Sequence, residues 1–428
     1  MLIDATTQTT LGNVYILTGE DDLHVGLDVT LESTYVDAAS RTGADAVISW
    51  TGTHNITVDG TIHGADEAIN LVGCLTAQTV NIGAGGQLFG GGDGVVEDAD
   101  GVILDGAGSS LSNAGRITAW GSAISAIVQD HSTMTLTNSG YMYGRVSGIW
   151  HKFGNGALSF TNTGTVKSPN ASYLGGESTD SVTNQGTMIG TVSLGGGDDL
   201  YDGRGGHVSG AILGGNGGDR FVTGNHADKM DGGEGIDTLD LSALTKGVVI
   251  NLAAQDSNAG VTVRHDIYTS IERILSGSGA DRLTGDAADN VLNGAANHDT
   301  LSGGDGADEL IGGSSKDYLT GGAGSDRFVF LTNSGTGDII ADFSDGEDKI
   351  VLEGSAFGYG EASGGPSAAD FIVSSIKNGA VDASDHFILR QKDATLWYDA
   401  DGNGSISAVM VADLQPGATL TAASIEFI

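Results

Sequence analysis

The segment Leu301–Phe330, LSGGDGADELIGGSSKDYLTGGAGSDRFVF, contains one short pattern three times. Each copy has a Gly-Gly pair, then an Asp, then a bulky apolar residue, and the copies recur every nine residues. A fixed period of this kind indicates tandem units that stack, because one small unit cannot bury its apolar face alone. The segment therefore predicts a repetitive structure in the second half of the chain.

The same pattern extends upstream in two runs. Residues 276–329 divide into SGSGADRLT, GDAADNVLN, GAANHDTLS, GGDGADELI, GGSSKDYLT and GGAGSDRFV. Residues 214–240 divide into GGNGGDRFV, TGNHADKMD and GGEGIDTLD, and a looser relative, LGGGDDLYD, precedes them at 194–202. The segment between the two runs contains less glycine and is predicted to be an inserted β element.

The consensus G-G-x-G-x-D-x-U-x resembles the repeat of the RTX proteins, which include haemolysin-type toxins and serralysin-type secreted proteases. The resemblance implies a turn from the first six residues of each unit and a short strand from the last three. Two units then form one coil of a parallel β-roll. It also implies that the eighth-position side chains point inward and stack: Leu283, Leu292, Leu301, Leu310, Leu319 and Phe328.

Because successive units alternate between the two sides of such a roll, each sixth-position residue should meet the one two units later. The implied pairs are Asp281 with Asp299, Asn290 with Asp308, Asp299 with Asp317, Asp308 with Asp326 and Asp219 with Asp237. Two carboxylates and about four carbonyl groups suit Ca²⁺, which takes 6–8 oxygen ligands. Zinc would require His or Cys, and Mg²⁺ a stricter octahedron with retained waters.

The resemblance therefore predicts several bound calcium ions. Glycine belongs in such a site because it adopts positive φ and allows backbone carbonyls to approach one point. A glycine-rich turn array without metal is the alternative, but its stacked carboxylates would repel one another. The candidate ligand-forming residues are Gly214, Gly215, Asn216, Gly217, Asp219, Asp228, Gly232, Gly233, Gly235, Asp237, Asp281, Asn290, Asp299, Gly303, Gly304, Asp305, Gly306, Asp308, Gly312, Gly313, Asp317, Gly321, Gly322, Gly324, Asp326 and Asp338.

Four units depart from the consensus, and we expect weaker sites there. GAANHDTLS and TGNHADKMD lack the leading Gly-Gly, and GDAADNVLN has Asn290 where Asp is usual. GGSSKDYLT has Ser315 in place of the fourth glycine and Lys316 beside its Asp.

A second, looser repeat occupies the N-terminal half. Short apolar–polar alternations meet at Asn/Gly turns, and aligned glycines are 26, 29, 25, 24 and 22 residues apart: Gly60, Gly86, Gly115, Gly140, Gly164 and Gly186. Strand-period runs at this spacing predict a parallel β-helix-like solenoid. The pattern resembles the β-helices of autotransporter passengers and surface adhesins. An antiparallel β-sandwich is the alternative.

The sequence thus predicts an all-β protein with an N-terminal solenoid, a calcium-binding parallel β-roll and a C-terminal β cap. The predicted segments are N-terminal cap or assembly strands at 1–46, the β-helix-like solenoid at 47–193, a first β-roll segment at 194–242, an inserted β element at 243–275, the main β-roll at 276–329 and a C-terminal β cap with a secretion signal at 330–428.

Charge and composition exclude several classes of function. The 428 residues include 55 Asp plus Glu against 18 Lys plus Arg, a net charge of −37. This balance disfavours nucleic acid and anionic lipid as partners. Cys74 is the single cysteine, so no disulfide framework exists. The sequence shows no apolar run long enough for a membrane span and no pattern of an N-terminal signal peptide.

The C-terminal stretches DIIADFSDGEDKIVL and WYDADGNGS are similar to those of RTX proteins exported by type I systems. The resemblance implies that type I secretion machinery of a Gram-negative bacterium reads an uncleaved C-terminal signal. Low cytosolic calcium would leave the repeats unfolded, and external calcium would fold them. An EF-hand loop from Asp399 would need Glu at its twelfth place, which is Met410, so a hairpin turn is predicted instead.

No catalytic residue is assigned, because neither H-E-x-x-H nor G-x-S-x-G occurs. The sequence therefore favours an extracellular structural or adhesive protein of a surface layer or matrix. Its expected partners are calcium and either copies of itself, in a homo-oligomer or lattice, or cell-surface polysaccharide. The alternative is a β-helix polysaccharide lyase, hydrolase or uronate epimerase. Its candidate groups would be His63 with Asp66 and Glu67, Asp98 and Asp100, Asp130 with His131, and His151 with Lys152.

Overall fold

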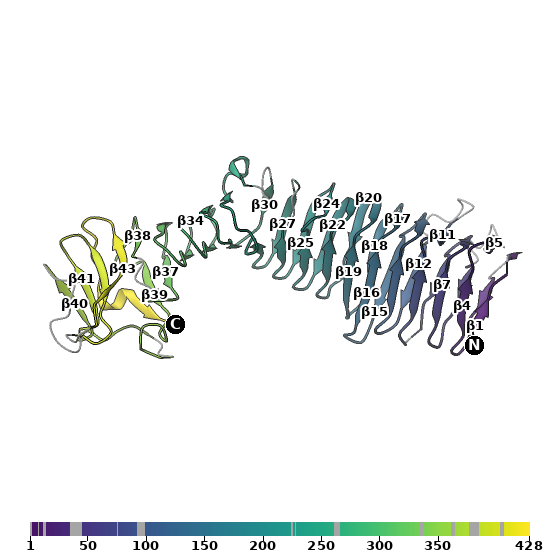
Figure 1. Ribbon diagram of the computed structural model, residues 1–428, viewed down its shortest axis with the longest axis horizontal. Helices are drawn as coiled ribbons and strands as arrows, with labels where there is room; N and C mark the ends of the chain where they lie inside the picture. Colours follow the sequence, from purple (N-terminus) through teal and green to yellow (C-terminus); the bar gives the residue numbers. More distant parts are fainter. Residues whose placement is uncertain are drawn as a thin grey trace. The chain divides into compact units, whose positions relative to one another are not determined.

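The computed structural model describes residues 2–428 apart from 7, 12–13, 35–44, 75, 92–98, 224–225, 227, 261–265, 334–336, 361–363, 376–384 and 403–405. Regular structure in the described residues consists of strands β1–β44 and two short 3₁₀-helices, η1 (Gln255–Ser257) and η2 (Ala422–Ser424). The predicted all-β fold is confirmed. The chain forms two compact units, Met1–Asp237 and Thr238–Ile428 (Figure 1).

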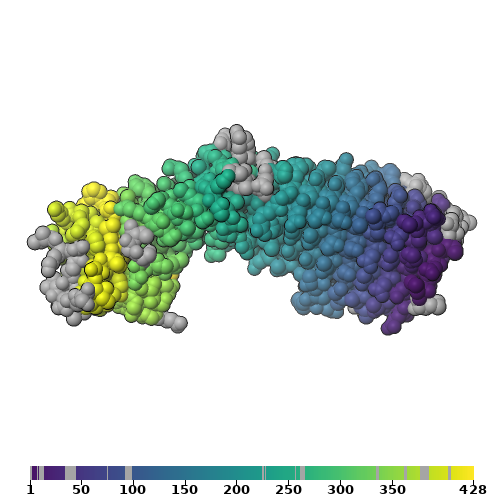
Figure 2. Space-filling view, in the orientation of Figure 1, coloured from purple at the N-terminus to yellow at the C-terminus, as the bar shows by residue number. Residues whose placement is uncertain are grey.

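The first unit is a parallel β-helix, in which the chain winds through strands that each pair with their counterparts one coil before and after. Parallel pairing through the unit excludes the antiparallel sandwich. Figure 2 shows the colour changing steadily along this unit, so consecutive coils are neighbours. One face contains β1 (Leu2–Asp4), β4 (Asp22–Val25), β7 (Asn55–Val58), β10 (Thr79–Ile82), β13 (Ser110–Asn113), β16 (Thr133–Asn138), β19 (Ala157–Asn162), β21 (Ser181–Asn184), β23 (Leu200–Asp202) and β26 (Arg220–Val222).

Two further runs of strands complete the coils. The second run contains β2 (Gln8–Leu11), β5 (Thr30–Thr34), β8 (Thr61–Gly64), β11 (Gln87–Gly90), β14 (Arg116–Ala119), β17 (Tyr141–Gly144), β20 (Thr165–Leu174), β22 (Thr187–Gly196), β24 (His207–Val208), β25 (Ile212–Asn216) and β27 (Lys229–Glu234). The third contains β3 (Tyr15–Ile16), β6 (Val47–Ile48), β9 (Ile69–Leu71), β12 (Val102–Asp105), β15 (Ile124–Val128) and β18 (Ser147–Gly154).

Period-two alternation places one apolar side chain per coil at the same inward position. Because the strands are parallel and in register, these side chains form continuous buried rows. One such row contains Leu23, Ile56, Val80, Leu111, Leu136, Phe160, Val182, Tyr201 and Phe221.

A column of stacked asparagines lies inside the β-helix. Nδ2 of Asn113 donates to Oδ1 of Asn138 at 2.8 Å, Asn138 donates to Asn162 at 2.8 Å, and Asn162 donates to Asn184 at 2.9 Å. Their side chains are buried. Oδ1 of Asn162 and of Asn184 also accepts the backbone N–H of the glycine two residues later. This asparagine ladder explains the recurring N-x-G turns of the N-terminal half.

The second unit begins as a two-sided β-roll. One side contains β28 (Thr238–Asp240), β31 (Arg273–Leu275), β33 (Val291–Asn293), β35 (Glu309–Ile311), β37 (Arg327–Phe330), β39 (Lys349–Leu352) and β44 (Ile425–Phe427). The other contains β29 (Val249–Asn251), β32 (Arg282–Thr284), β34 (Thr300–Asp305), β36 (Tyr318–Ala323) and β38 (Asp338–Ile340). The segment between β29 and β31 holds η1 and β30 (Ile267–Thr269).

The eighth residues of the nonapeptides stack inside this roll. Leu283 pairs with Leu301 and Leu301 with Leu319 on one side, while Leu292 pairs with Leu310 and Leu310 with Phe328 on the other. All six side chains are fully buried. Their rows supply the narrow apolar core of the roll.

The C-terminal part closes the roll with a mixed sheet. It contains β40 (Phe371–Ser374), β41 (Phe387–Arg390), β42 (Thr395–Tyr398) and β43 (Val409–Leu414). β41, β42 and β43 pair antiparallel, and β43 adds in parallel to β38. The acidic turn that begins at Asp399 connects β42 and β43, and residues 403–405 of this turn lie outside the described residues.

Candidate metal sites

The sixth-position residues of the nonapeptides form a ladder along one side of the roll. The backbone N–H of Asp281 donates to Oδ1 of Asp299 at 2.7 Å, Asp299 to Asp317 at 2.8 Å, and Asp317 to Asp338 at 3.0 Å. Each carboxylate thereby joins its own coil to the coil before it. These four side chains are buried, as expected for residues between stacked coils.

The opposite side of the roll carries the same arrangement. The N–H of Asn290 donates to Oδ1 of Asp308 at 2.8 Å, Asp308 to Asp326 at 3.0 Å, and Asp326 to Asp348 at 3.0 Å. Asp348 is absent from the predicted ligand set because the nine-residue pattern has already ended before it. The acidic run D-G-E-D at 345–348 is the sequence feature that could have identified Asp348 as a candidate.

A third ladder lies in the first unit. Asp199 N–H donates to Oδ1 of Asp219 at 2.8 Å, and Asp219 N–H donates to Asp237 at 2.7 Å. Upstream, Asp180 N–H donates to Asp199 at 2.6 Å. Sequence reasoning identified the pair Asp219 and Asp237 but missed Asp199, which sits in the loose repeat LGGGDDLYD, 20 residues before Asp219 instead of 18.

The second carboxylate oxygen in these ladders distinguishes them from ordinary polar cores. It is buried, and no described residue forms a hydrogen bond with it, at six positions: Asp199, Asp219, Asp281, Asp299, Asp308 and Asp317. A buried carboxylate oxygen without a partner costs roughly 1–3 kcal/mol or more. Lines of such oxygens therefore indicate positions for a cation.

Backbone carbonyl groups converge on these same oxygens. A Cβ atom at Gly214 would lie 2.1 Å from Oδ2 of Asp219 and 2.4 Å from the carbonyl oxygen of Gly232. At Gly303 it would lie 2.0 Å from Oδ2 of Asp308, with the carbonyl oxygen of Gly321 at 2.6 Å. Only glycine leaves this space free. The donor set consists of oxygen alone and fits Ca²⁺ better than zinc.

The glycines at the second and fourth positions of a nonapeptide keep space free in the turn in a different way. Gly304 and Gly306 adopt φ of +125° and +118°. One coil later, a Cβ at Gly322 would lie 1.9 Å from the carbonyl oxygen of Gly304, and one at Gly324 would lie 1.8 Å from that of Gly306. Side chains are excluded here by both backbone angle and space.

The departures from consensus show where this arrangement is strained. Ala295, Asn297 and Ser315 replace glycine and nevertheless adopt positive φ, of 64°, 74° and 92°. Asn290 places an amide in the carboxylate column, and its buried Nδ2 has no hydrogen-bond partner among the described residues. These are the units for which weaker sites are predicted.

Burial controls the protonation of the ladder carboxyls. Desolvation raises the pKa of Asp199 to about 8 and that of Asp299 to about 7, and neighbouring carboxylates contribute to both shifts. It raises the pKa of Asp219, Asp308 and Asp317 to about 6. Hydrogen bonds from backbone N–H groups oppose the rise without cancelling it. A bound cation would favour the ionised form instead.

Asp180, at the N-terminal end of the third ladder, is satisfied by side chains. Nδ1 of His151 lies 3.0 Å from its Oδ2, and the Tyr173 hydroxyl donates to the same oxygen at 2.8 Å. Oδ1 accepts the N–H of Leu158 at 2.8 Å. Both carboxylate oxygens of Asp180 have partners, so the column of unpartnered oxygens begins at Asp199.

The other predicted ligand residues fall into distinct environments. Asp228 and Asp326 are buried, whereas the side chains of Asn216 and Asp305 are exposed. Gly224, Asn225 and Ala227 of the unit TGNHADKMD lie outside the described residues. Gly215, Gly217, Gly233, Gly235 and Gly313 adopt positive φ like their counterparts in the main run. The predicted glycines and buried carboxylates thus occupy the turns along the ladders.

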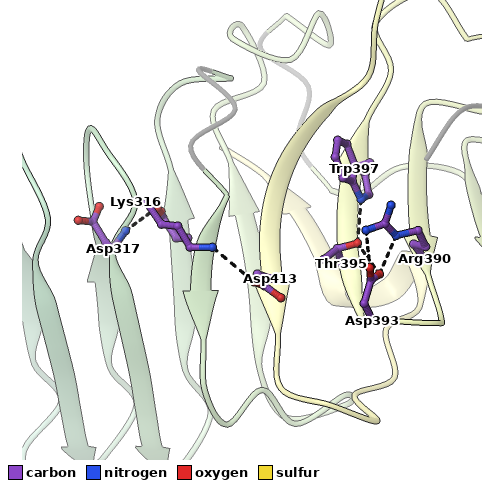
Figure 3. A network of polar contacts seen from close by, with 8 residues as sticks. Lys316, Asp317, Arg390, Asp393, Thr395, Trp397 and Asp413 are labelled. Carbon is purple, nitrogen blue, oxygen red and sulfur yellow. Dashed lines mark hydrogen bonds and ion pairs between the residues drawn. The ribbon is translucent and has the colours of Figure 1, made fainter. Parts of the chain in front are cut away.

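Lys316, which departs from the usual repeat beside Asp317, contacts the C-terminal strands. Its Nζ lies 3.4 Å from Oδ2 of Asp413 on β43 (Figure 3). In the same view, Arg390 pairs with Asp393, and the indole N–H of Trp397 donates to Thr395 at 2.8 Å. The lysine therefore links the roll to the strands that close it.

The catalytic groups weighed from the sequence are dispersed. Asp66 and Glu67 lie with Asp45 in one cluster whose ligand atoms are within 4.8 Å of one another. His63 stacks on Phe89 instead, with ring centroids 4.4 Å apart. The remaining groups are separate: Asp98 lies outside the described residues, Asp100 accepts the N–H of Ser122, Asp130 and His131 form a turn at positive φ, His151 contacts Asp180, and Lys152 lies over Trp150.

Comparison with known families agrees with the geometry of the ladders. The family model of the RTX calcium-binding nonapeptide repeat, which describes four copies of the repeat, matches three stretches of the chain, residues 211–239, 269–301 and 294–328. No curated protein matches the chain. In the part of the chain that the structure describes, no helix is long and apolar enough to cross a membrane.

Proposed function

We propose that this chain, an RTX protein whose nonapeptides bind Ca²⁺, is an extracellular structural or adhesive protein of a surface layer, matrix fibre or adhesin. The family match supports calcium binding by the nonapeptide repeats. The proposal adds the residues that hold the ions, the place where they act and what the folded chain does there.

The buried, unpartnered carboxylate oxygens are the observation that carries the proposal. We assign the ions to the ladders, with the sixth-position carboxylates and the carbonyl groups of the glycine turns as ligands. Calcium would supply the charge that the ladders lack, and its binding energy would become folding energy. The chain has a net charge of −37, so this neutralisation also relieves self-repulsion.

The same chemistry supports export before folding. At the low calcium concentration of the cytosol, the ladders would stay open and the chain could be threaded through type I secretion machinery of a Gram-negative bacterium. Outside the cell, millimolar calcium would close the coils. The similarity of the C-terminal stretches DIIADFSDGEDKIVL and WYDADGNGS to those of type I substrates supports this route.

The N-terminal end of the β-helix supports self-association. In the described residues, β1 pairs only with β4. Large apolar side chains are exposed in this part of the unit, including Leu2, Ile16 and Leu27. A free strand edge and exposed apolar side chains favour pairing with another copy.

Chelation of surface protein tests the proposal most directly. Intact cells are washed with EGTA, with magnesium-containing buffer as the control, and the released chain is detected by blotting. Release by EGTA alone, followed by reassembly into large particles when calcium is restored, is expected for a layer or adhesin. Protein that is free in the medium under both conditions and stays monomeric in calcium would contradict it.

One observation favours the enzymatic alternative. Burial raises the pKa of Glu67, and a hydrogen bond with Asp45 raises it further, so this carboxyl is held protonated beside another acid. A carboxyl that is held protonated can act as a general acid on glycosides. Incubation with alginate and pectate tests this function: new reducing ends or unsaturated uronates, lost in Glu67→Gln, would support it, and their absence would exclude it.

A further inference from the structure

One stretch of a β-helix face, from β11 to the start of β20, has a charge opposite to that of the chain as a whole. The outward positions of β11, β14, β17 and the start of β20 hold no Asp or Glu, in a chain with 55 of them. Basic and aromatic side chains occupy this face instead. The outward residues are Gln87, Phe89, Arg116, Thr118, Tyr141, Tyr143, Thr165 and Lys167, which the strand register places in two adjacent rows.

A pocket of about 420 Å³ lies where β11, β14 and β17 end. This volume falls within the range of small-molecule sites. Trp120 and Arg145 form one wall, and the guanidinium carbon of Arg145 lies 4.8 Å from the centre of the Trp120 ring. Both side chains are exposed to solvent. The remaining lining residues are Gly90, Gly91, Thr118, Ala119 and Tyr143.

Two polar groups that line this pocket lack an ion-pair or hydrogen-bond partner among the described residues. Arg145 forms no ion pair with any described carboxylate, although acidic residues outnumber basic ones threefold. Thr118 Oγ1 is buried and has no hydrogen-bond partner among the described residues. Tyr143 lies directly across from Thr118 on the neighbouring strand. A cation and an unsatisfied hydroxyl thus stand beside aromatic rings.

Gly91 keeps the pocket open. It adopts φ of +74°, and a Cβ atom there would lie 2.9 Å from Cδ1 and 3.1 Å from Cβ of Trp120. A side chain at this position would push the indole ring away or fill the space in front of it. The glycine therefore preserves access to the ring.

We propose that this pocket binds a hexuronate residue of an acidic polysaccharide. The apolar face of the sugar ring would pack on Trp120, and its carboxylate would pair with Arg145, whose planar guanidinium suits bidentate recognition of a carboxylate. Thr118 and Tyr143 would hydrogen-bond to sugar hydroxyls. The inference rests on the adhesive side of the proposed function and gives it a site and a ligand class.

Calorimetric titration of the full chain in calcium with trimannuronate, a hexuronate trimer, tests the site, and neutral maltotriose is the comparison. We expect the acidic trimer to bind at least about tenfold more tightly than the neutral one, a difference near 1.4 kcal/mol. Arg145→Gln and Trp120→Ala should each weaken binding of the acidic trimer by about tenfold or more, and Thr118→Val by a few-fold. Trp50→Ala, another exposed tryptophan of the same unit, serves as the matched control and should leave binding unchanged.

The proposal is overturned if trimannuronate does not bind, if maltotriose binds equally well, or if Arg145→Gln binds like the wild type. Circular dichroism of every variant checks that the β-helix is intact. Thr118→Val changes little volume, so it remains informative if the Trp120→Ala variant does not fold. Chelator-dependent folding of the roll is measured in the same samples. Failure of the calcium proposal can therefore be distinguished from failure of the sugar-site proposal.

Discussion

The asparagine ladder of the β-helix and the aspartate ladders of the nonapeptide coils solve the same stacking problem with different chemistry. An amide both donates and accepts, so Asn113, Asn138, Asn162 and Asn184 satisfy one another. A carboxylate only accepts, so at Asp199, Asp219, Asp281, Asp299, Asp308 and Asp317 one oxygen takes a backbone N–H and the second stays buried without a hydrogen-bond partner among the described residues. The first column is complete in protein alone, whereas the second contains unpartnered acceptors that the proposed cation would satisfy. One side-chain atom in each coil, an amide nitrogen or a carboxylate oxygen, therefore decides whether the stability of the column depends on calcium in the medium.

Removal of calcium should produce the largest difference in stability between the regions that contain the two kinds of ladder. EGTA is expected to unfold the coils at 276–329 while the β-helix around the asparagine ladder stays folded. Calcium at 1,000 times its dissociation constant stabilises by about 4 kcal/mol per site, and several sites are lost together. Hydrogen exchange with mass spectrometry on the full chain measures this difference. Equal protection of both regions in EGTA and in calcium would contradict the comparison.

Asp308→Asn should break the carboxylate column at one coil. The variant keeps the shape of the side chain but removes the charge that faces the proposed ion, so we expect a loss of about 3 kcal/mol in calcium. Asp289→Asn, an exposed change in the nonapeptide one coil earlier that keeps an oxygen acceptor for the N–H of Ala307, is the matched control and should cost little. Calcium-dependent melting reports both, and equal effects of the two variants would show that the buried position is not special.

Asn162→Asp tests the reverse exchange in the β-helix. The new carboxylate cannot donate to Oδ1 of Asn184, so the two acceptors would face each other in a buried column. We expect destabilisation of the first unit by about 2 kcal/mol, without rescue by calcium. Thermal melting in EGTA, where the β-helix transition stands alone, measures it. A calcium-restored melting temperature would mean that a metal site can be made from any ladder carboxylate.

Acid should partly replace calcium in the aspartate ladders. Burial raises the folded-state pKa of Asp299 to about 7 and that of Asp308 to about 6, above the value near 4 expected in the unfolded chain. Between these values the folded state binds more protons, so its stability is full below about pH 4 and is lost as pH rises through 6 to 7. Chelated protein should therefore be more structured at pH 5 than at pH 8, by on the order of 1 kcal/mol per carboxyl. Circular dichroism of the chelated protein across this pH range shows whether acid stabilises or destabilises the fold.

The smallest effect is expected where glycine has been replaced within a turn. Ser315 adopts φ of 92°, which an L-residue rarely does and glycine does freely. Ser315→Gly should stabilise the roll by about 0.5–1 kcal/mol, while Ser325→Gly, at the variable fifth position of the next nonapeptide, should not stabilise it. Calcium titrations with thermal melting compare them. Equal gains would show that the turn at Ser315 is unstrained.

Prediction from the sequence was most accurate for the features that a strict nine-residue period imposes. The stacking of Leu283 on Leu301 and the placement of Asp299 beside Asp317 both result from alternation in a two-unit coil. Asp199 was missed because its coil has two additional residues, which breaks the period while preserving the fold. The residues of the sugar pocket also could not be predicted from the sequence. Thr118 and Tyr143 are neighbours only because one β-helix coil here spans 25 residues.

Each ladder also has a direction. The backbone N–H of Asp281 is completed by a carboxylate 18 residues later, that of Asp299 by the next, and so on toward Asp338. A coil is therefore finished only when its C-terminal neighbour is already in place. Growth from the C-terminal end offers each incoming aspartate N–H a carboxylate that is already in place, whereas growth from the N-terminal end leaves that N–H without its acceptor until the next coil arrives. Under the proposed export route, passage led by the C-terminal signal would bring the acceptor carboxylates to calcium first, and each added turn would oppose return of the chain.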